Sequence, residues 1–140
     1  MQVFIVGSPL ETAMILDSRR LNKQIIETEQ IIKAITGESK AWNSHPVVKM
    51  YKDYLPWLML YKFTLIYFRQ GDIISARNMS GDADIIRPNF HTCDFFDQMK
   101  RRLYTKDDKY YSQWSYLGKS DVNWYYVSGS WLYYKKGKRL

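Results

Sequence analysis

The sequence is poor in the residues that build disulfides and metal sites. Its 140 residues include one cysteine, Cys93, and two histidines, His45 and His91. A single cysteine excludes an internal disulfide, and these three residues do not have the spacing of zinc ligands. We therefore expect no metal and no other cofactor. A lone thiol also fits a reducing cytoplasm, that of the host if the protein is viral.

Long apolar runs are missing as well. The longest, residues 54–68, is broken by Pro56 and Lys62, and it is shorter than the roughly 20 residues that a bilayer-spanning helix needs. The first nine residues are apolar but lack the basic start and the cleavage site of a secretory signal. The sequence thus predicts no membrane partner.

Acidic residues are scarce relative to basic ones. Lys and Arg number 21 against 14 Asp and Glu, which gives a net charge of +7. On so small a protein this charge favours a polyanionic partner, nucleic acid first. The chain can close one hydrophobic core and is too short for two ordinary domains. We expect a single domain over residues 1–140, of unknown oligomeric state.

The spacing of apolar residues predicts a mainly α fold. A helix is expected after the Ser8-Pro9 start, and a long one is expected to end at Gly37. Pro46 should open a third helix, and two short helices should follow residues 93 and 106. Residues 71–89 read as a connection with one turn of helix. The helix over residues 53–70 is expected to bury Leu55, Leu58, Met59, Phe63, Ile66 and Tyr67.

Within residues 1–103, the predicted helical core, one helix has an unusual polar face. Arg20, Lys23, Gln24 and Glu27 fall at i, i+3, i+4 and i+7, so a helix aligns them. Two interpretations remain open: a site for an anion or a base edge, and a solvated face with a Lys23–Glu27 ion pair. A buried stripe is predicted beside them, formed by Leu21, Ile25, Ile32 and Ile35.

The segment 104–140 is aromatic and basic, and we expect it to be irregular. Residues 104–134 hold 11 of the 23 aromatic residues, interleaved with cations. Such a pattern suits bases stacked on rings with phosphates held by cations. A packed aromatic lid over a small core is the alternative.

Several short motifs together resemble a known family. They are Leu-Asp-x-x-Arg-Leu-x-Lys-Gln-x-x-Glu over residues 16–27, Trp-x-x-His-Pro over 42–46, Phe90-His91, and Lys106-Asp107 with Tyr110. In this order they resemble the pyrimidine-dimer DNA glycosylase-like family, from about residue 15 to about residue 111. The resemblance implies an endonuclease V-like glycosylase fold and favours DNA over RNA as the partner.

The resemblance also implies a chemistry. The related phage photoproduct enzyme attacks the sugar with its terminal amine after methionine removal, and a helical glutamate stabilises the charged intermediate. Here Gln2 is large, which predicts that Met1 is retained, and Arg19-Arg20 stands where that enzyme has an Arg-Glu pair. Glu27 and Lys23 are therefore the candidate catalytic residues, as carboxylate and imine-forming amine. The candidate substrate-binding residues are Arg20, Gln24, Trp42, His45, His91, Lys106 and Tyr110.

The sequence thus favours a DNA-binding, glycosylase-like protein that extrudes a damaged or modified base, with Trp42 or a C-terminal aromatic residue filling or capping the pocket. Two alternatives stay open. One is a non-catalytic nucleic-acid-binding or inhibitory module with the same fold. The other is a small nucleotide-processing enzyme.

Overall fold

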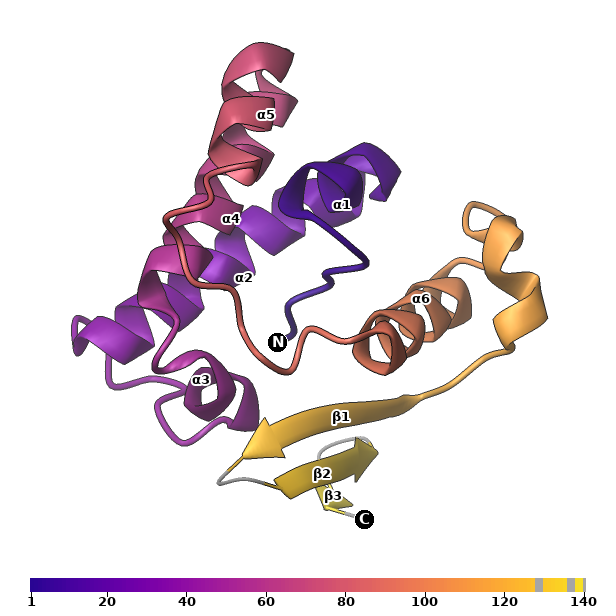
Figure 1. The fold of residues 1–140 in the computed structure, drawn as a ribbon. Coiled ribbons are helices and arrows are strands. Elements are labelled where there is room, and N and C mark those ends of the chain that lie inside the picture. The colour runs from indigo at the N-terminus through magenta and orange to yellow at the C-terminus, as the bar shows by residue number, and fades with distance from the viewer. Residues whose placement is uncertain (128–129, 136–137, 140) are drawn as a thin grey trace. The chain divides into compact units, whose positions relative to one another are not determined.

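The computed structural model describes residues 1–127, 130–135 and 138–139, with side chains through residue 122 (Figure 1). It is mainly helical, as the sequence predicts. The chain divides into two compact units, Met1–Pro88 and Asn89–Leu140. The single domain expected from the sequence stays a prediction. No helix among the described residues is long and apolar enough to cross a membrane.

The first unit is built of helices around one central helix, α4. This helix contacts α1, α2 and α5, and α2 also contacts α3. The helices of this unit are α1 (Pro9–Ile15), α2 (Ser18–Thr36), α3 (Pro46–Tyr51), α4 (Leu55–Arg69) and α5 (Ile73–Ser80).

The predicted helix boundaries of this unit are largely confirmed. The Ser8 hydroxyl caps α1 by accepting a hydrogen bond of 3.1 Å from the Glu11 N–H. Gly37, with φ of 80°, ends α2 in the left-handed region that favours glycine. Of the predicted stripe on α2, Leu21, Ile25 and Ile32 are buried and Ile35 is half-buried.

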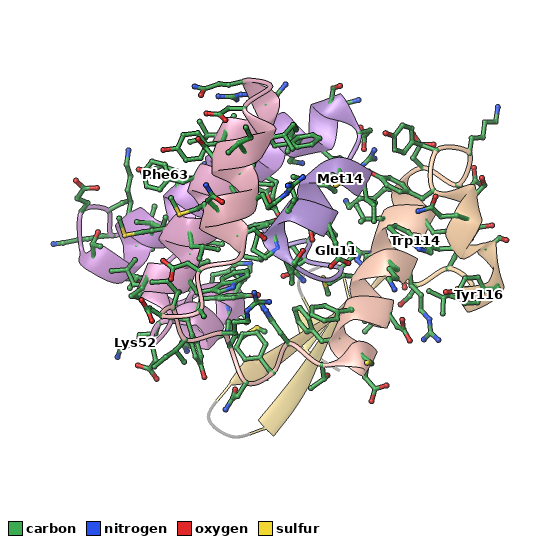
Figure 2. The ribbon with its side chains drawn as sticks, turned by 45° about the horizontal axis from the view of Figure 1, so that its top comes forward. Glu11, Met14, Lys52, Phe63, Trp114 and Tyr116 are labelled. Atoms are coloured by element: carbon green, nitrogen blue, oxygen red, sulfur yellow. The ribbon has the colours of Figure 1, made fainter. Side chains whose placement is uncertain are left out.

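The predicted buried face of α4 is wrong at most positions. Only Leu58 of that set is buried, while Met59 and Phe63 are 42% and 37% exposed. Figure 2 labels Phe63 among the side chains of the first unit. The reason is that α4 carries apolar residues on all sides, so spacing alone does not select the inward face. The residues that pack inward are Trp57, Leu58, Leu60, Tyr61, Thr64 and Leu65.

The connection after α4 holds more helix than the single turn expected. Asp72 caps α5 by accepting from the Ser75 N–H at 3.0 Å, and the helix runs for eight residues. Its last residue, Ser80, accepts a hydrogen bond of 3.0 Å from the Leu10 N–H. This bond joins α5 to the start of α1.

The second unit combines helix and sheet, so the expectation of an irregular C-terminal segment is wrong. Val122–Val127 pairs antiparallel with Ser130–Lys135, which pairs antiparallel with Lys138–Arg139. Tyr, Trp and Val favour strands, and they fill these positions. The elements are α6 (Cys93–Lys106), the 3₁₀ helix η1 (Ser112–Leu117), β1 (Val122–Val127), β2 (Ser130–Lys135) and β3 (Lys138–Arg139). The helix expected over residues 106–114 is replaced by a turn and η1.

Candidate active site at the chain terminus

Residues 2–4 run beside α2 and are bonded to one buried side chain of that helix. The Gln24 Oε1 atom accepts from the Phe4 N–H, and its Nε2 atom donates to the Gln2 carbonyl at 2.8 Å. Gln24 is 2% exposed. The Gln24 amide therefore bonds to an N–H and a carbonyl of this segment, as the backbone of a neighbouring strand does in a sheet.

Tyr61 of α4 supports this arrangement from the other side. Its hydroxyl donates to Gln24 Oε1 at 2.9 Å and lies 3.4 Å from the Phe4 carbonyl oxygen. The ring is fully buried and stacks on Trp57, with centroids 5.2 Å apart. Trp57 in turn stacks on Tyr51, with centroids 5.7 Å apart. Burial first, and the Glu27 carboxylate second, raise the pKa of Tyr61 well above its ordinary value. The hydroxyl thus keeps its proton and acts as a donor.

Glu27 lies at the first peptide bond of the chain. Its Oε2 atom accepts from the Gln2 N–H at 3.3 Å, and its side chain is 15% exposed. The Lys23 Nζ atom is 4.0 Å from Glu27 Oε1, and the Lys23 side chain is 68% exposed. The ion pair expected at this spacing is therefore present. The structure adds that its carboxylate also contacts the backbone of residue 2.

The polar face predicted on α2 divides into residues with different surroundings. Arg20 pairs with Asp17 at 3.2 Å at the start of the helix. Gln24 is buried against residues 2 and 4, and Lys23 extends into solvent. Burial is one of the ways in which a lysine is activated as a nucleophile, and the 68% exposed Lys23 side chain does not have it. The imine-forming role of Lys23 stays a prediction.

His45 caps α3 and lies within electrostatic reach of the chain terminus. Its Nδ1 atom accepts from the Val47 N–H at 3.1 Å, which assigns the proton of the neutral ring to Nε2. Burial first, and the positive charge of the terminus second, lower the pKa of His45. A neutral imidazole is thereby favoured, with one N–H to donate.

Trp42 contacts His45 edge to face, with ring centroids 6.0 Å apart. Its φ of 67° places a bulky side chain in the left-handed region, which costs roughly 1–3 kcal/mol. It is also 52% exposed. A strained, exposed aromatic residue beside a histidine is typical of a binding loop more than of a packed one.

The sequence does not predict two residues of this candidate site, Tyr61 and Gln2. Tyr61 lies in α4, where apolar spacing predicts the wrong inward face, and the sequence singles out Gln2 only as a residue that disfavours methionine removal. Gln2 is 4% exposed, and its Nε2 atom is buried without a hydrogen-bond partner among the described residues. One signal was available, because Gln2 is the polar residue in the otherwise apolar run Met1 to Val6.

Comparison with known proteins agrees with this part of the chain. Residues 1–67 match the model of the pyrimidine dimer DNA glycosylase family. The resemblance inferred from the motifs is thus confirmed, and the match contains Gln2, Gln24, Glu27, His45 and Tyr61. No curated protein and no solved structure matches the chain.

The remaining predicted site residues lie in the second unit, beyond the part that matches the glycosylase family. His91 stacks on Phe95, with centroids 5.3 Å apart. Lys106 is the last residue of α6, and Tyr110 is 53% exposed with its ring edge against Tyr111. The aromatic and basic side chains from residue 123 onward lie outside the described part, so their predicted role stays a prediction.

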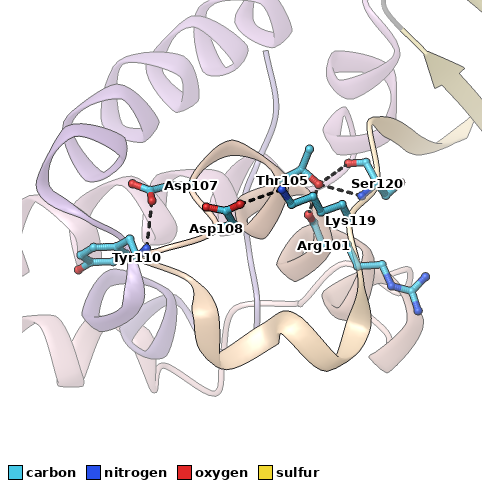
Figure 3. A network of polar contacts seen from close by, with 7 residues as sticks. All are labelled: Arg101, Thr105, Asp107, Asp108, Tyr110, Lys119 and Ser120. Atoms are coloured by element: carbon cyan, nitrogen blue, oxygen red, sulfur yellow. Dashed lines mark hydrogen bonds and ion pairs between the residues drawn. The ribbon is translucent and has the colours of Figure 1, made fainter.

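Polar contacts in the second unit fasten its own elements together (Figure 3). The Thr105 hydroxyl donates to the Arg101 carbonyl at 2.7 Å and accepts from the Ser120 N–H at 2.8 Å. Lys119 pairs with Asp108 at 2.8 Å. These bonds hold the residues before β1 against α6. Among the described residues no group of His, Cys, Asp and Glu side chains is arranged to hold a metal ion.

Proposed function

We propose that this protein is a DNA glycosylase that removes a damaged or modified base, with the terminal amine as nucleophile and Glu27 as the catalytic carboxylate. The observation that carries the proposal is the 3.3 Å contact between the residue 2 nitrogen and Glu27 Oε2. It brings a nearly buried carboxylate to the end of the chain. The match of residues 1–67 to the glycosylase family supports the same reaction class.

The chemistry is a displacement at the sugar. The amine lone pair forms a bond to C1′ while the bond from C1′ to the base breaks, and the departing base takes up a proton that the attacking amine loses. The C1′–O4′ bond of the sugar then breaks as the nitrogen forms a double bond to C1′, and the second proton of the nitrogen passes to O4′. The product is an imine between the chain terminus and C1′. Positive charge develops at the sugar during the first step, and the Glu27 carboxylate stabilises it. The bonded nitrogen belongs to residue 2, so the Met1 amine lies one residue beyond it.

Trp42 and His45 are the proposed contacts to the extruded nucleotide. A base that reacts must leave the helical stack, and an exposed ring replaces part of the lost stacking. The Nε2 proton of His45 suits a phosphate or carbonyl oxygen. Arg20, Lys23, His91, Lys106 and Tyr110 remain proposed contacts to DNA, in keeping with the net charge of +7. A cytoplasmic location is part of the same proposal.

Borohydride trapping tests the reaction, because reduction converts the imine into a stable amine link. The purified protein is incubated with oligonucleotides that carry a pyrimidine dimer, an abasic site or no lesion. Peptide mass spectrometry then locates the adduct. We expect it on the first residue, and the mass shows whether that residue is Met1 or Gln2.

Other outcomes select other functions. An adduct on Lys23 identifies the Lys23 amine as the nucleophile. Lys23→Ala should then abolish trapping, and Lys33→Ala on the same helix, the control, should not. DNA binding without any adduct or base release supports the binding module. Absence of DNA binding even at low salt favours the nucleotide-processing enzyme.

A further inference from the structure

Two side chains, those of Gln24 and Tyr61, hold the backbone of the chain terminus in place. Gln24 bonds to the Gln2 carbonyl and to the Phe4 N–H, and the Tyr61 hydroxyl bonds to Gln24 Oε1 and approaches the Phe4 carbonyl. Gln24 and Tyr61 come from two packed helices and are 2% and 0% exposed. We call Gln24 and Tyr61 the terminal clamp.

Chain termini usually fray unless something ties them down. A terminal amine that must react at a fixed sugar carbon cannot move freely, since a misplacement of about 1 Å lowers a rate about 10²-fold. Fixing the last residues therefore has a direct use in the reaction proposed above.

The clamp also fixes the register of the segment. Residues 2 and 4 face Gln24, whereas the Val3 N–H bonds to the Gln2 side chain, and Val3 and Ile5 are fully buried. A slip by one residue would move the terminus by about 3.3 Å and reverse the side-chain directions of an extended segment. Val3 and Ile5 would then lose their buried positions.

We propose that Gln24 and Tyr61 are positioning residues that fix the register of residues 2–4 and so bring the terminal amine to Glu27. The positioning part rests on the proposed glycosylase function. The clamp itself is a property of the fold and has its own measurement. The sequence analysis expected Gln24 to contact substrate, and this proposal gives it a different role.

The test compares three variants. Gln24→Met keeps the length of the side chain and removes the amide, Gln24→Glu keeps an oxygen for the Phe4 N–H, and Tyr61→Phe removes only the hydroxyl. Thr64→Val is the control, because it removes a buried hydroxyl from α4 that donates to Leu60 one turn away. The readouts are amide hydrogen exchange at Phe4, the single-turnover rate of trapping, and the Kd for DNA.

We expect Gln24→Met to speed exchange at Phe4 and to slow trapping about 10²-fold, with an unchanged Kd. Gln24→Glu should restore protection of the Phe4 N–H in part, and Tyr61→Phe should fall between these variants. Thr64→Val should resemble wild type in all three readouts.

Unchanged Phe4 exchange in Gln24→Met overturns the clamp. Faster exchange with an unchanged trapping rate overturns the positioning role. A wild-type protein that gives no adduct with any DNA overturns the glycosylase function, while the exchange data still decide whether the clamp exists. If Gln24→Met does not fold, Gln24→Glu and Tyr61→Phe decide the matter by the same criteria.

Discussion

The two units of the molecule differ in how they distribute charge. Met1–Pro88 contains 11 basic and 9 acidic residues, whereas the shorter Asn89–Leu140 contains 10 basic and 5 acidic residues. Most of the net positive charge therefore lies in the second unit. The part that matches the glycosylase family lies in the first. Under the proposed function, this difference predicts that the second unit contributes more of the electrostatic attraction of DNA and that the first unit holds the reacting groups.

The two units also differ in what their side-chain hydrogen bonds hold in place. In the first unit, buried groups from α2 and α4 converge on residues 2–4 and leave a carboxylate beside them. In the second unit, the Gln98 amide bonds to Ser120 just before β1. The Thr105 hydroxyl also bonds to Ser120, as Figure 3 shows. The first unit uses polar bonds to hold residues 2–4 beside Glu27. The other uses them to hold its own elements, with Tyr110 and Tyr116 exposed.

The chemistry proposed for the first unit depends most strongly on Glu27. Glu27→Gln keeps the size of the side chain and removes the charge, so trapping should fall about 10²- to 10³-fold if the carboxylate stabilises the reacting sugar. Single-turnover trapping measures this, and the Kd for DNA should change little. Glu29→Gln is the matched control, since Glu29 lies on the same helix and pairs with Lys62 at 2.7 Å. An equal loss in both variants would remove Glu27 from the chemistry.

A second test separates core from site along α2. Leu21 is buried, so Leu21→Ala should lower the free energy of unfolding by about 2–5 kcal/mol. Arg20 forms a partly exposed pair, so Arg20→Ala should cost less than about 1 kcal/mol and act mainly on DNA binding. Urea unfolding and a binding titration measure the two effects. Comparable destabilisation in both variants would make the Arg20 pair a structural element.

Local signals in the sequence predicted the helix ends well and the buried faces less well. The Ser8 cap, Gly37 and Pro46 act through backbone geometry within a few residues, so their effect can be read directly. Helix α4 is apolar on all sides, and its inward face is set by contacts with three other helices. The strands after residue 121 differ from the prediction because Tyr, Trp and Val favour strands, whereas the aromatic and basic pattern alone suggests a binding surface or a lid.

The sequence predicts only those parts of the candidate site that lie within one helix. Glu27 and its pairing with Lys23 follow from helical spacing, and both were identified. The contact of Glu27 with residue 2 spans 25 positions, and the Tyr61 contact with Gln24 spans 37. No periodicity within one element reports such pairs. The structure also shows that Gln24 and Glu27 bring polar groups of α2 to residues 2–4.

The salt dependence of DNA binding tests whether the charge difference between the units matters for affinity. Each lysine that contacts a phosphate of duplex DNA contributes about −0.9 to the slope of log K against log salt. Lys106→Gln and Lys109→Gln in the second unit should each reduce the slope by about that amount. Lys33→Gln in the first unit should not. A slope that changes only with Lys33 would place the attraction of DNA in the first unit.

The smallest expected effect concerns pH and His45. Burial and the positive terminus lower the pKa of His45 below its ordinary value, so the unfolded chain binds a proton more readily than the folded one. Stability should therefore fall as the pH drops through about 6.5, the ordinary histidine pKa, and the loss should level off below the folded-state pKa. Protonation at Nδ1 also removes the acceptor that caps α3.

His45→Asn keeps a capping oxygen without the titration, so its stability should exceed that of wild type at pH 5 and be similar at pH 8. Urea unfolding at both pH values measures the difference, from which the carboxylates common to both proteins cancel. Parallel curves for the two proteins would show that His45 does not titrate on unfolding.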